Sequence, residues 1–192
     1  MREGFSGDRT ASAGLTSHGV PDLYSKFGLQ RSAHHDQPGE HNEGAEMLGR
    51  DLVLALASEQ AKGEGETFPL DRIRMQKAAF LVSMRGTDEL RTYDFEPYNW
   101  GPYSGELNTD LRAMAAGDLL DLERRPGHQY PEFKTTPAGE DRANKVWSQL
   151  EPREQAFLRS VRKFVTGRSF SRLLRDVYAA YPDYATKSQF SG

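Results

Sequence analysis

The stretch that decides the fold runs from Ser104 to Pro137 and reads SGELNTDLRAMAAGDLLDLERRPGHQYPEFKTTP. It opens with apolar residues at the spacing of one helical face, behind a serine suited to cap that helix. Two short segments with strand character follow, Leu119–Glu123 and Tyr130–Thr135, joined by a turn of basic, Pro and Gly residues. We predict a helix over 105–116 and then a β-hairpin with a basic tip, which is the element order of a winged helix-turn-helix core.

Helices are predicted on both sides of this stretch. Apolar periodicity indicates helices over 48–61 and 70–84, the second apolar on most sides and therefore buried on most sides. A short strand is expected to end near Pro97, followed by a turn through 99–102. Three further helices are expected to begin near Pro137, Pro152 and Ser169. The predicted class is α+β and mostly helical, a winged-helix-like core with a short strand, a β-hairpin and additional C-terminal helices.

The chain divides near residue 47. Residues 1–47 are rich in Gly, Ser, His and acidic side chains and lack sustained apolar periodicity, so we expect a disordered or mispredicted N-terminal extension. Four of the five histidines lie there, and we interpret them as solvated side chains rather than metal ligands. Residues 48–190 are expected to form a single domain.

Composition limits the chemistry. The chain has 192 residues, a formal net charge of −3 and no cysteine, which excludes disulfides, cysteine zinc sites and thiol catalysis. It has neither an apolar run long enough to span a membrane nor an apolar leader, so a cytoplasmic protein is expected. Nucleotide-binding and hydrolase motifs are missing, and His128 is the only histidine after residue 47. We therefore expect no enzyme, no metal and no cofactor.

Polar residues interrupt the otherwise apolar helix predicted over 70–84. Gln76 and Lys77 fall between apolar neighbours, where an unpaired amide or ammonium group is costly. One interpretation makes them polar contact points in a pocket or interface. The other has the lysine reaching the surface and the glutamine bonded to neighbouring backbone.

The segment Phe95–Ser104 (FEPYNWGPYS) is the second candidate site, and we name it the aromatic corner. It holds four aromatic residues, two prolines and a glycine, so it is stiff and sharply bent. Tyrosine and tryptophan are favoured at recognition surfaces. The corner is either a binding surface or a structural bend whose rings cover the core. The residues singled out for partner binding are Gln76, Lys77, Tyr98, Trp100, Gly101, Pro102 and Tyr103.

Positive charge gathers near the C-terminus, where residues from Pro152 onward carry eight basic and three acidic side chains. Helical spacing groups Arg159, Arg162, Lys163 and Arg168 into one predicted basic face. Such a face attracts phosphate or an acidic protein, or it is an ordinary solvated surface.

Several of these residues carry a resemblance to a known family. Met75-Gln76-Lys77, the run from Tyr98 to Ser104 and the segment Ser171–Ser188 (SRLLRDVYAAYPDYATKS) resemble the SocA-like antitoxins, known as the Panacea domain, and their YwgA-like bacterial relatives. The resemblance covers roughly residues 70–188. It implies a regulatory protein that binds a protein partner, a toxin in the antitoxin branch.

A second resemblance points to DNA. The run from Leu107 to Leu120, with Tyr130 to Gly139 behind it, is similar to the recognition helix, wing and closing segment of MarR- or PadR-type regulators. That analogy places a set of six residues toward DNA, namely Asn108, Thr109, Arg112, Arg124, Arg125 and His128. Since Glu106 and Asp110 would repel phosphates, strong DNA affinity is not expected. The predicted function is therefore a non-enzymatic module that binds a protein, with a DNA-binding regulator as the alternative.

Overall fold

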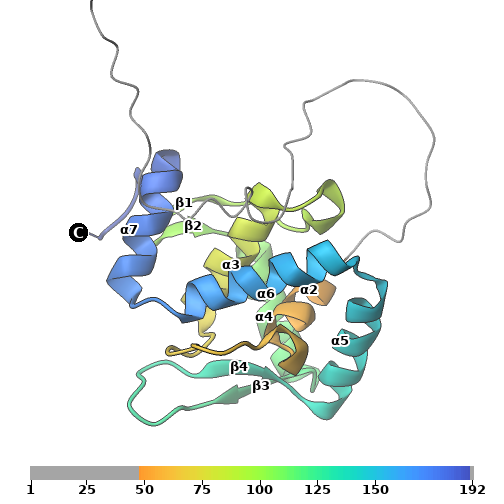
Figure 1. Cartoon of the computed structure of the whole chain (residues 1–192). Helices are drawn as coiled ribbons and strands as arrows, with labels where there is room; N and C mark the ends of the chain where they lie inside the picture. The colour runs from red at the N-terminus through yellow and green to blue at the C-terminus, as the bar shows by residue number, and fades with distance from the viewer. Residues whose placement is uncertain (1–47, 191–192) are drawn as a thin grey trace, which may run out of the picture.

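The structure is a computed structural model that describes residues 48–190 (Figure 1). The helices are α2 (Gly49–Ala57), α3 (Arg72–Arg85), α4 (Gly105–Ala116), α5 (Pro137–Gln149), α6 (Pro152–Thr166) and α7 (Phe170–Ala180). The strands are β1 (Glu96–Tyr98), β2 (Gly101–Tyr103), β3 (Leu120–Glu123) and β4 (Glu132–Thr135), and short 3-10 turns lie at 59–61, 88–90 and 182–185. The predicted N-terminal extension and its histidines lie outside the described residues.

The fold class is confirmed as α+β and mostly helical, with two separate antiparallel hairpins, β1–β2 and β3–β4. Helix α4 leads directly into the β3–β4 hairpin, which is the element order that the sequence predicts. No helix in the described part of the chain is both long and apolar enough to cross a membrane.

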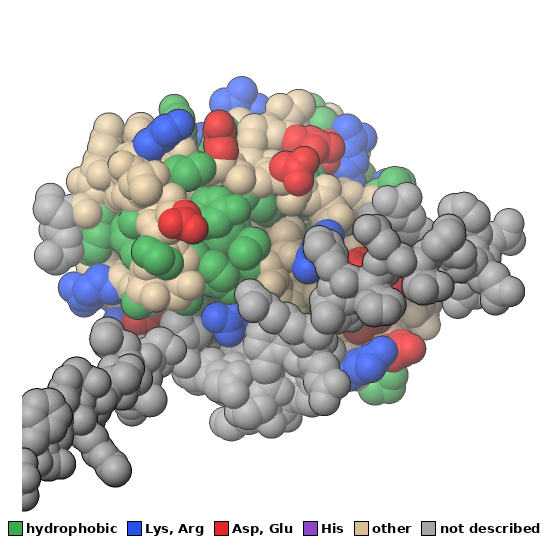
Figure 2. Space-filling model, turned by 90° about the horizontal axis from the view of Figure 1, so that it is seen from above, with side chains coloured by type: hydrophobic (Ala, Val, Ile, Leu, Met, Phe, Trp, Pro, Cys, Tyr) green, Lys and Arg blue, Asp and Glu red, His purple; other side chains and the backbone are tan. Residues whose placement is uncertain are grey.

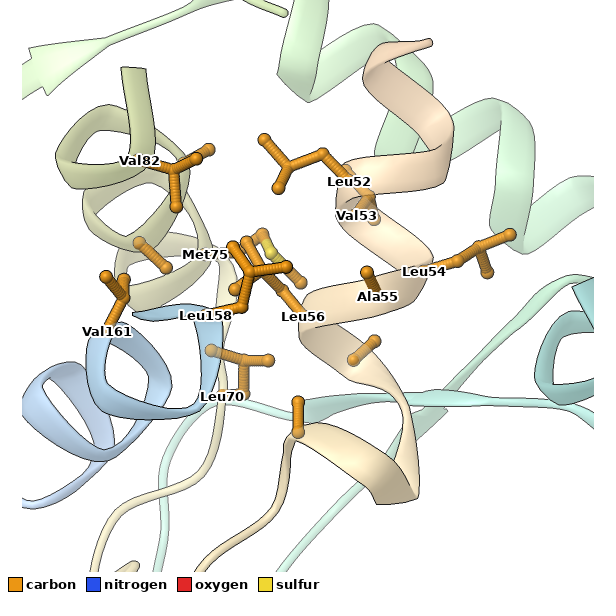
Figure 3. Close-up of a cluster of buried hydrophobic side chains, with 14 of the residues drawn as sticks. Leu52, Val53, Leu54, Ala55, Leu56, Leu70, Met75, Val82, Leu158 and Val161 are labelled. Atoms are coloured by element: carbon orange, nitrogen blue, oxygen red, sulfur yellow. The ribbon is translucent and has the colours of Figure 1, made fainter. Parts of the chain in front are cut away.

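Helix α3 lies at the centre, and every residue from Arg74 to Ser83 is buried. Helices α2 and α6 pack against it, and their leucine and valine side chains meet those of α3 in one core (Figure 3). A helix with apolar residues on most sides must be covered on most sides. This explains why hairpin β1–β2 and helix α4 also pack against α3.

Four of the helices, α3, α4, α5 and α7, begin with a side-chain N-cap. Asp71, Ser104, Thr136 and Ser169 each accept a hydrogen bond from the backbone N–H three residues later. These bonds satisfy donors that a helix N-terminus leaves unpaired. The predicted starts at Ser104, Pro137 and Ser169 are thereby confirmed.

Several predicted boundaries are wrong. Helix α3 begins at Arg72 and not at 70, because Asp71 caps it. Helix α2 ends at Ala57, not at 61, because Ser58 takes an extended conformation and only a 3-10 turn follows. Strand β4 begins at Glu132, so Tyr130 and Pro131 belong to the hairpin loop, where the missing proline N–H costs no ladder bond.

The aromatic corner is a hairpin and not a strand followed by an irregular turn. Strands β1 and β2 pair antiparallel around Asn99 and Trp100, with Pro97 directly opposite Pro102. Neither proline has an N–H, and every second pair in an antiparallel ladder exchanges no hydrogen bonds. Two facing prolines are therefore tolerated at this position, and Pro97 does not end the strand.

An aromatic cluster holds the corner against the C-terminal end of the chain. The Phe80 ring of α3 makes edge contacts with Phe95, Tyr181 and Tyr184 at 4.7–5.4 Å between ring centroids. The backbone N–H of Gln189 also donates to the Asn99 carbonyl at 2.9 Å. Figure 2 shows this end of the molecule, where hydrophobic side chains gather on the surface beside single charged ones.

Gly101 is required by both conformation and space, which gives a stability prediction. Its φ is +85°, and a Cβ there would lie 2.7 Å from Cε1 of the Tyr178 ring; Gly127 has a similar φ of +78° with open space around it. We expect Gly127→Ala to lower the free energy of unfolding by about 1 kcal/mol through backbone strain alone. Gly101→Ala should cost about 2–4 kcal/mol, because a clash is added. Urea denaturation measures both variants, and equal losses would contradict the packing of Tyr178 on Gly101.

Candidate functional site

A cavity of about 680 Å³ lies where α3, the aromatic corner, α4 and the β3–β4 hairpin meet. We name it the corner cavity. Its wall is formed by Asp71, Arg72, Ile73, Gln76, Lys77, Tyr98, Trp100, Gly101, Tyr103, Asn108, Leu111, Arg112, Ala115, Leu122, Tyr130, Pro131 and Phe133. The structure therefore brings Gln76, Lys77 and four of the five corner residues predicted for partner binding to one place. Pro102 is buried immediately beside it.

Gln76 fixes the corner to the central helix. Its Nε2 donates to the Ser104 carbonyl at 2.9 Å, and its Oε1 accepts from the Ser104 N–H at 2.8 Å. The side chain is 3% exposed. Of the two interpretations that the sequence leaves open, the structure shows the one in which the amide bonds to neighbouring backbone. Gln76 thus positions the start of α4 and is not an exposed contact point.

Lys77 is buried at the cavity wall. It is 2% exposed, so the expectation that its side chain reaches the surface is wrong. Its Nζ donates to the Pro102 carbonyl at 2.8 Å, the only hydrogen bond that this group makes to a described residue. Burial lowers the pKa of Lys77 to about 7, and Asp71 opposes that shift only partly.

Exposed apolar side chains surround the corner cavity. Tyr98 is 47% exposed and stacks on Tyr103 at 4.9 Å between ring centroids. Trp100 is 39% exposed and makes a T-shaped contact with Phe170. Leu122 and Tyr130 of the opposite hairpin are more than half exposed. Since large apolar side chains rarely gather on a surface without a binding role, this rim is the strongest candidate for a contact surface.

The charges of the cavity wall are mainly positive. Arg72 and Arg112 have no ion-pair or hydrogen-bond partner among residues 48–190. Asp71 is the only acidic residue in the wall, and it is already bound to Arg74 at 2.6 Å and to the α3 N-terminus. The site therefore suits a ligand or partner that carries negative charge.

The residues predicted to face DNA separate into two groups. Asn108 and Arg112 line the corner cavity, whereas Thr109 lies on the exposed side of α4 and donates to the Gly105 carbonyl. Arg124 in the hairpin loop is exposed. Arg125 lies 3.9 Å from Glu132, and His128 is half-buried in a T-shaped contact with Phe68, at 6.1 Å between ring centroids. The loop residues are therefore only partly available to a ligand.

The predicted basic face on α6 is wrong. Arg162 is completely buried, pairs with Glu66 at 2.9 Å and donates to the Leu56 and Ser58 carbonyls. Arg168 pairs with Asp176 and covers the Phe164 ring. Arg159 is exposed but donates to the Gln60 carbonyl, which leaves Lys163 as the exposed member without a described partner. A helical charge pattern cannot reveal partners supplied by distant segments.

Nine residues of the cavity wall were not predicted as site residues, among them Arg72, Leu122 and Tyr130. Leu120 and Leu122 point to the same side of β3. Only Leu120 reaches the core, because the hairpin extends beyond the core at Leu122. The alternating pattern of the strand places Leu122 on the apolar face, but it does not reveal that this end of the hairpin is exposed. Among the described residues, no group of three His, Cys, Asp or Glu side chains could hold a metal ion.

Comparison with known proteins returned no relative: no protein-family model, curated protein or solved structure matches this chain. The resemblance to the SocA-like and YwgA-like families therefore stays a sequence-based prediction.

Burial of Lys77 predicts a pH dependence of stability. The ordinary pKa of the group is 10.5, and in the folded protein it is about 7, so between these values only the unfolded chain binds the proton. Stability contributed by the neutral amine therefore rises as pH increases from 7 toward 10, by up to about 1.4 kcal/mol per pH unit. Urea denaturation should show the free energy of unfolding of the unmodified chain rising relative to that of Lys77→Met over this range. A difference that does not change with pH would contradict the burial.

Proposed function

We propose that this chain is a non-enzymatic regulatory module of the cytoplasm that binds a protein partner, in the manner of an antitoxin or an adaptor. One observation carries the proposal. Four of the six most exposed large hydrophobic side chains in the described part of the chain, Tyr98, Trp100, Leu122 and Tyr130, surround the corner cavity. Aromatic anchors beside a pocket are typical of the energetic centre of a protein interface.

The charge of the site specifies the partner. Arg72 and Arg112 offer guanidinium groups with no described acceptor, and the one wall carboxylate is already paired. A partner segment that presents apolar side chains next to acidic ones satisfies both features. The apolar side chains would enter between the two hairpins, and the acidic ones would set register and speed encounter.

Variants at matched leucines test the docking surface. Leu122 borders the cavity, and Leu48, also more than half exposed, does not line it. The partner is first identified by stoichiometric co-purification. Leu122→Ala together with Trp100→Ala should then raise the dissociation constant about 30-fold or more, as expected for loss of interface anchors. Leu48→Ala should leave it unchanged. Calorimetric titration of the purified pair measures both, and equal affinities would contradict docking at the corner cavity.

A DNA-binding regulator is the second candidate, because Arg112 of α4 and Arg124 of the hairpin loop are exposed and lack an ion-pair partner among the described residues. If it holds, a gel shift with duplex DNA should weaken steeply between low and physiological salt. Arg124→Ala with Arg125→Ala should abolish the shift. Arg153→Ala with Arg175→Ala removes the same charge from α6 and α7 and should not. A shift that survives in both double variants, or none at low salt, excludes this candidate.

A further inference from the structure

The corner cavity has the features of a small-molecule site as well as a docking surface. Its volume of about 680 Å³ falls within the range of ordinary ligand pockets, about 300–1,000 Å³. Its wall contains the rings of Tyr98, Trp100, Tyr103, Tyr130 and Phe133. Such walls bind flat or elongated apolar groups.

The polar groups of the wall select for charge. Lys77 donates one N–H to the Pro102 carbonyl and makes no other hydrogen bond to a described residue. Arg112 from α4 adds a guanidinium without a described acceptor. Asp71 already pairs with Arg74 and accepts a hydrogen bond from the N-terminus of α3. The wall therefore contains no other carboxylate that could pair with Lys77 or Arg112.

The depth of Lys77 decides what kind of molecule can meet it. The residue belongs to the wall and is only 2% exposed, so it contributes to the buried part of the wall rather than to the exposed rim. A peptide would have to bring its backbone amides into this apolar space, and unpaired buried amides are costly. A small organic acid brings one charged group and an apolar body.

We propose that the corner cavity binds a small amphipathic carboxylate whose apolar body lies against the aromatic wall and whose carboxylate is bound by Lys77 and Arg112. Such a ligand occupies the space beside Trp100 and Leu122, so it would compete with a protein that docks there. The ligand site itself does not depend on the docking proposal.

Phenylbutyrate and its uncharged counterpart phenylbutyramide test the proposal. Trp100 is in the cavity wall and Trp147 is buried in the core, so tryptophan fluorescence of the purified chain reports occupancy. The unmodified protein should bind phenylbutyrate at least about tenfold more tightly than phenylbutyramide, the ratio expected for a charged hydrogen bond.

Arg112→Gln is the decisive variant, because Arg112 is exposed and its loss leaves the core intact. It should remove the preference for the carboxylate, as should Lys77→Met if that variant folds. Arg124→Gln loses the same charge outside the cavity and should keep the preference. Equal affinity for the two compounds, no binding of either, or a preference that survives Arg112→Gln would overturn the proposal. Partner binding that depends on Leu122 and Trp100 would stand in each of those cases.

Discussion

The structure depends on one constraint: the polar side chains buried on helix α3 must find partners, and they find them on the backbones of surrounding segments. Arg74 donates to the Val165 and Arg168 carbonyls, Gln76 exchanges two hydrogen bonds with Ser104, and Lys77 donates to Pro102. Each unmade bond of this kind would cost about 1–3 kcal/mol. The central helix therefore specifies where the end of α6 and the start of α4 lie.

The same constraint shapes the corner cavity. Lys77 and Gln76 bind the second strand of the aromatic corner and the cap of α4 by hydrogen bonds. Phe80, on the same helix α3, packs against Phe95 of the corner. These contacts fix the corner against α3, and the Tyr98 and Trp100 side chains of the hairpin stay exposed. A rigid pair of exposed rings loses little conformational entropy on binding, which is the property that the proposed function needs.

The local patterns of the sequence predicted much of the fold, because caps and apolar periodicity act over a few residues. The helix over 105–116, its Ser104 cap and the hairpin behind it follow from such patterns. The second strand of the corner was not predicted, since proline normally argues against pairing and only the facing register of Pro97 and Pro102 removes that objection. The sequence grouped the corner residues with Gln76 and Lys77 as candidate partner-binding residues. It did not show that α4 and the β3–β4 hairpin complete the site.

The errors over charge have a different origin. Arg162 has the helical spacing of a surface residue, yet its carboxylate partner Glu66 lies 96 residues earlier in the chain. Lys77 was expected either at a contact or at the surface, and a backbone carbonyl of the corner holds it inside. Pairing across such distances is a property of the tertiary fold, so counts of charge along a helix cannot anticipate it.

The most direct test of this account is the amide hydrogen exchange of Ser104 in Gln76→Leu, followed by NMR. Gln76 accepts the Ser104 N–H in the folded chain. If it holds the corner in place, Ser104 should exchange at least about tenfold faster in the variant, because loss of a buried hydrogen bond lowers the local opening free energy by about 1–3 kcal/mol. Amides of α2 should exchange as before. Unchanged protection at Ser104 would contradict the claim that α3 positions the corner.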